Sequence, residues 1–227
     1  MDSVKKIFRV KEKEATLYAT DAENRPLIVL NNFHGDGSPV MEAVVNLDDK
    51  AEFNLLSIGN LNWGHDMTPW YAPPLSKDDT PCTGGADDYL RLLVSEILPE
   101  AKTMIRGTPS FTAIAGYSLA GLFALYSMYV CEEFDRVASM SGSLWFPDFK
   151  EYVFEHGFKK KPEKIYMSLG DAEAKTRNPV LSTVQDNSEK IAAFYREEGF
   201  DVTWELNPGN HFKDAALRSA KGILAIL

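Results

Sequence analysis

From residue 26 onward, runs of apolar and β-branched residues alternate with segments in which apolar residues recur every three or four positions. Continuous apolar runs are typical of strands buried on both faces, and the second spacing is typical of helices with one buried face. The runs predict strands at residues 26–31, 53–59, 110–116, 136–140, 164–169 and 201–206. The helical spacing predicts helices at residues 87–101, 119–129, 183–198 and 212–227. Elements in this alternation form crossover units on a mainly parallel sheet.

Two segments fall outside this alternation. Residues 7–10 and 15–19 carry apolar residues before a polar turn at 21–25, and they predict a short antiparallel start to the sheet. Residues 60–86 are rich in Pro, Trp, Gly and Asp and show no regular pattern. Irregular segments of this length in compact domains are usually functional or mobile, so we expect this one to form the rim of a site.

Length and composition favour one domain. The chain has 227 residues, of which 44% are hydrophobic, which is enough for a single α/β domain over residues 1–227 with helices on both faces of its sheet. The net charge of −9 argues against a nucleic-acid partner, because such a partner calls for a basic surface. No run of about 18 apolar residues is present, so we expect no membrane-spanning segment.

The cysteines and histidines exclude further classes of protein. Cys82 and Cys131 lack the C-x-x-C spacing of redox and metal sites, and no apolar signal segment follows Lys5 and Lys6. We therefore expect a reduced protein of the cytoplasm. The sequence has no H-x-x-x-H pattern and no cluster of cysteine and histidine, so it implies no metal and no other cofactor.

The strongest chemical signal lies where the strand at 110–116 runs into the helix at 119–129, through the sequence GYSLAG. A tight strand-to-helix turn can hold the hydroxyl of Ser118 out of the sheet, with the N–H of Leu119 and the positive end of the helix directed at an oxyanion. Small residues two positions before and after the serine leave room for this turn. The motif G-x-S-x-G has such a turn, and Ala120 stands here in place of its last glycine. Ser118 is the candidate nucleophile.

A serine nucleophile needs a base and a group that orients this base. In proteins with this turn, the acid and the base follow the serine in the chain, each on a loop after a late strand. Of the four histidines, His34 and His65 precede Ser118, and His156 lies where a helix is expected to end. His211 follows the last predicted strand on a turn-rich loop and is therefore the candidate base.

The acid is expected after the strand at 164–169. Asp171 and Glu173 both follow this strand, two residues apart. One of these carboxylates could instead cap the segment that follows. The residues alone therefore leave both open as the acid.

The second oxyanion donor is expected on the loop after the strand at 26–31. Glycines in this loop allow a backbone N–H to turn toward a pocket, which makes Phe33 the first candidate and His34 the next, beside the N–H of Leu119. Several aromatic residues in loops could line a pocket for a planar acyl group or a sugar: Trp145, Trp63, Trp70 and Tyr71.

With these residues in place, the chain resembles the Putative esterase (esterase D-like) branch of the α/β-hydrolases over nearly its full length. That branch includes feruloyl and acetyl-xylan esterases, siderophore esterases of the enterobactin type, S-formylglutathione hydrolases and mycolyl transferases. The segments that carry the resemblance are PLIVLNNF, GGADDYL, GYSLAG, SGSLW, GDAEAKTRNP and PGNHF.

The resemblance implies an α/β-hydrolase fold and cleavage of a small-molecule carboxylic ester through an acyl-enzyme on Ser118. In feruloyl-esterase-like relatives the acid lies three residues after the glycine that ends the strand, a position that corresponds to Glu173 here. Siderophore-esterase relatives tolerate a weak or missing acid, which leaves a dyad of Ser118 and His211 open. The alternatives are an acyltransferase with the same residues and a non-catalytic binding protein with the same fold.

Overall fold

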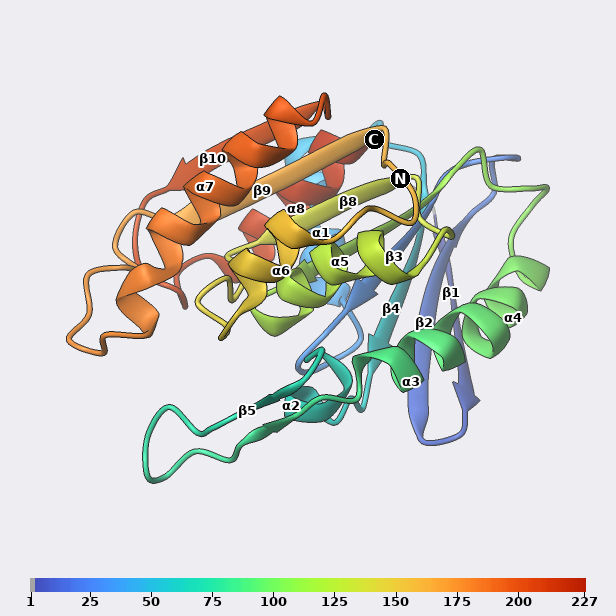
Figure 1. The fold of residues 1–227 in the computed structure, drawn as a ribbon. Coiled ribbons are helices and arrows are strands. Elements are labelled where there is room, and N and C mark those ends of the chain that lie inside the picture. The colour runs from blue at the N-terminus through green and yellow to red at the C-terminus, as the bar shows by residue number, and fades with distance from the viewer. Residues whose placement is uncertain (1–2) are drawn as a thin grey trace.

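An eight-stranded sheet, in the order β1-β2-β4-β3-β7-β8-β9-β10, runs through the computed structural model, which describes residues 3–227 (Figure 1). Its strands are β1 (Ser3–Val10), β2 (Lys13–Thr20), β3 (Leu27–Asn31), β4 (Asn54–Gly59), β7 (Thr112–Tyr117), β8 (Arg136–Met140), β9 (Lys164–Gly170) and β10 (Val202–Asn207). The pairs β1–β2 and β2–β4 are antiparallel, and every neighbouring pair from β4 to β10 is parallel. The predicted mainly parallel sheet with an antiparallel start is confirmed.

Helices cover both faces of the sheet, as predicted (Figure 1). One face carries α3 (Ala86–Leu92), α5 (Leu119–Val130), α6 (Phe149–Glu155) and α7 (Val184–Glu197), and the other carries α1 (Ser38–Leu47) and α8 (Ala215–Ile226). Because successive strand residues point to opposite faces, Val29 packs in the first of these cores, whereas Ile28 and Leu30 pack in the second. Within residues 3–227, no helix has both the length and the apolar character needed to cross a bilayer.

The sequence pattern missed α1 and α6, and it predicted one continuous helix at 87–101 where the structure has three parts. There α3 is followed by a π-helical turn, Leu93–Ile97, and then by α4 (Leu98–Thr103). Pro99 lies in the first turn of α4. Since proline has no N–H and its ring collides with the carbonyl one turn earlier, the wider turn accommodates it. A short 3₁₀ turn, Leu181–Thr183, likewise precedes α7.

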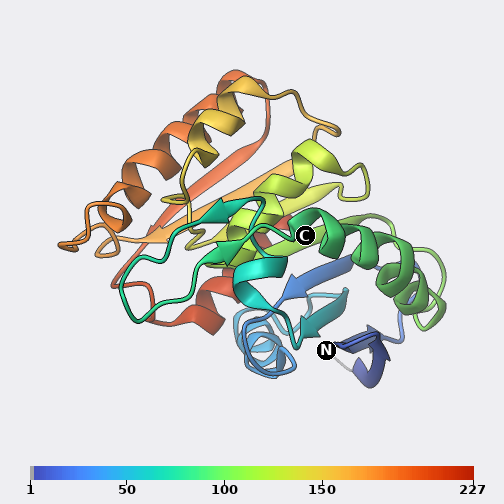
Figure 2. The same ribbon diagram turned by 60° about the horizontal axis from the view of Figure 1, so that its bottom comes forward.

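The irregular segment expected at 60–86 ends where α3 begins at Ala86, and residues 60–85 are called the arm here. The arm contains α2 (Trp63–Asp66) and a small hairpin of β5 (Tyr71–Ala72) and β6 (Cys82–Thr83) that projects from the body of the molecule (Figures 1 and 2). Its base is anchored by a buried ion pair between Lys13 and Asp66, whose carboxylate also accepts the N–H of Asn62.

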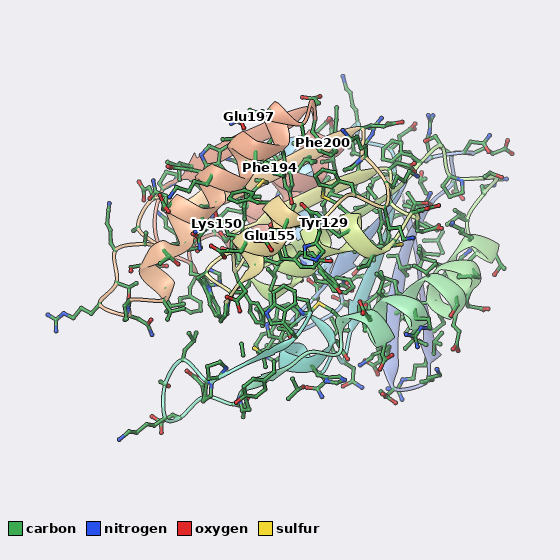
Figure 3. All side chains as sticks on the ribbon, in the orientation of Figure 1. Tyr129, Lys150, Glu155, Phe194, Glu197 and Phe200 are labelled. Atoms are coloured by element: carbon green, nitrogen blue, oxygen red, sulfur yellow. The ribbon has the colours of Figure 1, made fainter. Side chains whose placement is uncertain are left out.

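Aromatic rings fasten α7 to α5 near the amino end of β10. Phe158 lies 4.9 Å from Tyr129, 4.8 Å from Phe200 and 6.5 Å from Phe194, measured between ring centroids. Figure 3 labels Phe194 on α7, Phe200 just before β10 and Tyr129 on α5. This packing stabilises the end of the sheet that lies opposite the strands' carboxyl ends.

Parallel pairing brings the carboxyl ends of β3, β7, β8, β9 and β10 to one edge of the sheet. Asn31 pairs with Gly116 across β3 and β7, and Gly170 pairs with Asn207 across β9 and β10. The loops that follow these strands therefore lie side by side, at the edge where open parallel sheets place their binding sites.

Candidate active site

Ser118 stands between β7 and α5 in a backbone conformation that side chains rarely adopt, with φ of 61° and ψ of −125°. The turn is tight: a Cβ atom at Gly116 would lie 2.2 Å from the carbonyl oxygen of Ala120 and 2.7 Å from its Cβ. Because Gly116 has no Cβ atom, Ala120 can pack closely against it. The strained conformation is stabilised by hydrogen bonds from the N–H groups of Gly121 and Ser143 to the Ser118 carbonyl, both 3.0 Å long.

The structure brings Ser118, His211 and Glu173 together in one hydrogen-bonded chain. Nε2 of His211 lies 3.1 Å from Oγ of Ser118, and Nδ1 of His211 lies 2.7 Å from Oε2 of Glu173. The imidazole is 29% exposed, whereas the carboxylate is 4% exposed. The base can thus reach a bound substrate while its partner stays shielded from water.

Glu173 occupies a polar pocket behind the imidazole. Its Oε1 atom accepts hydrogen bonds from the N–H of Gly170 at 2.6 Å and from Nη1 of Arg218 at 3.1 Å. Burial by itself would raise the pKa of the Glu173 carboxyl group, but the hydrogen bond and charge of His211, with further bonds from Ser141 and Gly170, hold this pKa below its ordinary value. The group is therefore a carboxylate at neutral pH.

Asp171, the other candidate acid, contacts the backbone of the loop after β10 (residues 208–214, called the histidine loop here) instead of the imidazole. Its Oδ1 accepts the N–H of Gly209 at 2.8 Å. The N–H of Ala172 donates in return to the Gly209 carbonyl at 3.1 Å, and the N–H of Asp171 donates to the Asn207 carbonyl at 2.8 Å. Asp171 thus ties together the loop after β9 and the loop after β10.

Of the three candidate oxyanion donors, Leu119 follows Ser118 directly, and Phe33 and His34 line the same cavity as Ser118. Leu119 is the first residue of α5, so its N–H has no acceptor within the helix. Phe33 lies on the oxyanion loop (residues 32–37), and among residues 3–227 no backbone acceptor takes its N–H. Gly37 ends this loop with φ of 84°, and a Cβ atom there would lie 2.8 Å from the Ser57 side chain. Both constraints favour glycine at this position.

A cavity of about 460 Å³ opens over Ser118 and His211. Its walls come from the oxyanion loop, from the first turns of α1 and α8, and from the rings of Trp63, Tyr117 and Phe212. The wall includes no side chain of Asp, Glu, Lys or Arg. It can therefore receive an uncharged, largely apolar group beside the serine hydroxyl.

The predicted aromatic residues do not all reach this cavity. Trp63 lines it, and so do Phe33 and His34, whose rings lie 4.1 Å apart. Trp145 is not on the wall and packs against the hydrophobic core instead. Trp70 donates its indole N–H to the Pro147 carbonyl at 3.0 Å and is surrounded by core rings. The positions of these tryptophans in the sequence did not indicate which of them line the cavity and which pack against the core.

Sequence reasoning missed three residues near the nucleophile. Arg218 is 1% exposed and bonds to Glu173. Ser143 is also buried, and its Oγ lies 3.3 Å from Oγ of Ser118. Phe212 follows the candidate base and is 87% exposed. Phe212 and Ser143 could have been found, since they belong to the PGNHF and SGSLW segments, whereas nothing in the sequence marks Arg218.

The two remaining histidines, His65 and His156, lie outside the cavity wall. His65 bonds to the Thr83 hydroxyl on the arm, and His156 follows α6 with Nδ1 2.9 Å from the Tyr152 carbonyl. In the described part of the chain, no group of three or more His, Cys, Asp or Glu side chains is arranged to hold a metal ion.

Comparison with known proteins adds an independent observation. The model of a family described as "Putative esterase" matches residues 58–211, a range that contains Ser118, Glu173 and His211. The chain is 24% identical over 193 residues to the uncharacterized protein YbbA of Bacillus subtilis (strain 168), covering 81% of this chain and 76% of that one. It is 34% identical over 90 residues to a siderophore enterobactin esterase of Emericella nidulans, covering 36% and 30%.

Solved structures share the fold. The siderophore hydrolase EstA of Aspergillus nidulans matches with a TM-score of 0.74 and 17% identity, over 97% of this chain and 92% of that one. An IroE-like serine hydrolase of Shewanella oneidensis matches with a TM-score of 0.77 and 19% identity, over 98% and 79%.

Proposed function

The chain belongs to the Putative esterase family and is a carboxylic ester hydrolase, and we propose that it acts through an acyl-enzyme formed on Ser118. The observation that carries this proposal is the unbroken hydrogen-bonded chain from Ser118 through His211 to Glu173. In this arrangement a hydroxyl, an imidazole and a carboxylate have the mutual geometry that nucleophilic catalysis by serine requires.

In the first half of the reaction, Nε2 of His211 takes the Ser118 proton as Oγ attacks the ester carbonyl. The N–H groups of Leu119 and Phe33 stabilise the negative charge that develops on the carbonyl oxygen. When the tetrahedral intermediate collapses, the bond to the alcohol oxygen breaks and His211 gives its proton to the leaving alcohol. The acyl group stays on Ser118.

In the second half, His211 takes a proton from water, and the resulting hydroxide attacks the acyl-enzyme. Collapse of the second intermediate releases the carboxylic acid and returns the proton to Ser118. Throughout, Glu173 accepts the Nδ1–H of His211, which leaves Nε2 free to act as the base and stabilises the imidazolium when it forms.

The cavity wall indicates the kind of ester. Since no Asp, Glu, Lys or Arg side chain faces the cavity, the group bound beside Ser118 is uncharged. An anionic group would lose its hydration there without gaining a counter-charge, and the net charge of −9 opposes its approach. Neutral acyl esters are therefore the substrates that the site favours.

Hydrolysis of p-nitrophenyl butyrate by wild type and by Ser118→Ala tests the proposal. We expect kcat/KM of the variant to fall by at least about 10⁴-fold, because the nucleophile is lost. A fluorophosphonate reagent should label wild type at Ser118, and mass spectrometry of the labelled peptide would separate Ser118 from its neighbour Ser143. Thermal unfolding checks that the variant keeps its fold.

The matched control is Ser95→Ala, which removes an exposed hydroxyl far from the cavity and should leave kcat/KM unchanged. Equal rates for wild type and Ser118→Ala would refute the acyl-enzyme proposal. Product analysis with and without an added alcohol shows whether the acyl group passes to water or to an acceptor. Adding a siderophore ester and an anionic hemisuccinate ester to the panel tests the preference for neutral acyl groups.

A further inference from the structure

Arg218 is a charged side chain that the proposed reaction does not use. It lies on the first turns of α8 and is 1% exposed, which makes it the largest fully buried side chain among residues 3–227. Burying a guanidinium is costly unless its charge and its N–H groups all find partners. The partners it has found are all groups at the carboxyl edge of the sheet.

The guanidinium connects four separate segments. Nη1 donates to Oε1 of Glu173 at 3.1 Å, to Oγ of Ser141 at 3.1 Å and to the hydroxyl of Tyr117 at 3.3 Å. Nη2 donates to the carbonyl of Pro208 at 3.1 Å. These acceptors lie after β9, after β8, next to Ser118 and after β10. One planar cation thus holds the acid, the nucleophile turn and the histidine loop at fixed separations.

Tyr117 extends this network to the base itself. Its hydroxyl accepts from Arg218 and donates to the backbone carbonyl of His211 at 2.7 Å. His211 is therefore held twice: Glu173 orients its ring, and Tyr117 holds its backbone. Arg218 bonds to both of these residues.

The fit depends on a glycine. A Cβ atom at Gly170 would lie 2.9 Å from Nη1 of Arg218, 2.9 Å from Oε1 of Glu173 and 2.3 Å from the carbonyl of Gly209. Only glycine at this position allows the guanidinium, the carboxylate and the histidine loop to meet. The end of β9 is thus built to receive Arg218.

We propose that Arg218 is a positioning residue for the reaction, which holds Glu173 and the histidine loop so that the Ser118–His211 hydrogen bond is already formed before the substrate binds. This rests on the proposed function. Arg218 does not line the cavity, so it contacts no substrate. Its loss should lower kcat and leave KM nearly unchanged.

The test compares Arg218→Met, Arg218→Lys and Lys221→Met in hydrolysis of p-nitrophenyl butyrate. In Arg218→Met we expect kcat to fall by about 10²-fold, the loss that a displacement of about 1 Å causes, with KM within about 3-fold of wild type. Lysine keeps the charge but lacks the planar fork, so Arg218→Lys should recover part of the lost kcat. Lys221 lies one turn along α8 and pairs with Glu205, and Lys221→Met should retain wild-type kcat.

A proton NMR readout needs no turnover. The Nδ1–H of His211, hydrogen-bonded to Glu173, should give a signal far downfield in wild type and in Lys221→Met. In Arg218→Met this signal should be lost or shifted upfield. If the signal is lost in Arg218→Met and wild type shows no Ser118-dependent hydrolysis, the proposed function is refuted, and the result shows only that Arg218 holds the hydrogen bond between His211 and Glu173.

Three results would overturn the role of Arg218: wild-type kcat in folded Arg218→Met, a loss confined to KM, or an equal loss in Lys221→Met. Where Arg218→Met fails to fold, Arg218→Lys and Tyr117→Phe decide. Both should lower kcat at constant KM, because each removes part of the network and leaves the core apolar packing in place. Wild-type kcat in both would refute the proposal.

Discussion

The two sides of the cavity are held in different ways. On one side, Ser118, Glu173 and His211 lie on loops after β7, β9 and β10 that hydrogen-bond to one another through buried groups. On the other side, the oxyanion loop and Trp63 of the arm line the cavity, and the ring of Phe33 is 57% exposed. Phe33 contacts Trp63 of the arm only through ring packing, at 5.1 Å between centroids.

This difference matches what each side has to do. In the proposed mechanism, proton transfer between Ser118 and His211 tolerates displacements of only a fraction of an ångström, so its groups need fixed supports. Contacts to the rest of a substrate tolerate more movement, and exposed loops supply them. Substitutions on the first side should therefore act on kcat, and most substitutions on the second side should act on KM.

Glu173→Gln is the strongest test of the first side. The amide cannot fix the same imidazole tautomer or stabilise the imidazolium, so we expect kcat to fall by about 10³-fold or more, with little change in KM. Steady-state hydrolysis of p-nitrophenyl butyrate measures both constants. A loss below 10-fold would favour a dyad of Ser118 and His211 over a triad.

The same variant reports the charge state of Glu173. Because the folded pKa of this group lies below its ordinary value, its carboxylate stabilises the fold at pH above the unfolded pKa, and this contribution is lost as pH falls through the folded pKa. Urea unfolding between pH 6 and pH 3 should therefore show a shallower loss of stability in Glu173→Gln than in wild type. Equal slopes would mean that folding leaves the pKa of Glu173 unchanged.

Gly37→Ala tests the one point at which the second side has to be fixed. A Cβ atom there would lie 2.8 Å from the Ser57 side chain, and φ of 84° disfavours any side chain. The oxyanion loop must then shift, and with it the N–H of Phe33. Since a lost oxyanion donor costs about 10²-fold or more, a displaced one should lower kcat by about 10-fold.

Gly35→Ala is the matched control on the same loop. Gly35 also has a positive φ, of 79°, but a Cβ atom there meets nothing within 4 Å. Its substitution should slightly lower the melting temperature and leave kcat unchanged. Equal losses of kcat in the two variants would show that backbone strain, and not contact with Ser57, sets the position of the loop.

The fold, Ser118 and His211 were within reach of the sequence because each depends on a local pattern. The pattern left both Asp171 and Glu173 open as the acid, and only the family resemblance favoured Glu173. Ser118 lies at a strand-to-helix turn, and Glu173 and His211 follow parallel strands, whose carboxyl ends must meet at one edge of the sheet. The segment of α1 carries apolar residues at helical spacing, with Val40, Met41 and Val44 buried, but it is short and lies next to glycine-rich turns.

Other features arise only from tertiary packing. Arg218 lies on a helix with an ordinary amphipathic pattern, and nothing in its neighbours distinguishes it from an exposed arginine. Its burial follows from the space beside Gly170, across a separation of 48 positions in the chain. Trp70 similarly packs against rings of α6, an element that the sequence pattern did not reveal.

Phe33→Ala should have the smallest effect, and it separates the two roles of this residue. The proposed oxyanion donor is the backbone N–H, which alanine keeps, so kcat should stay within about 2-fold of wild type. The exposed ring lines the cavity and packs on Trp63, and its loss should raise KM for p-nitrophenyl butyrate by about 3- to 10-fold. Tyr71→Ala removes a similarly exposed ring outside the cavity wall and should change neither constant. A fall in kcat in Phe33→Ala, with KM unchanged, would show that the ring itself fixes the oxyanion loop, and the contrast between the two sides of the cavity would then fail.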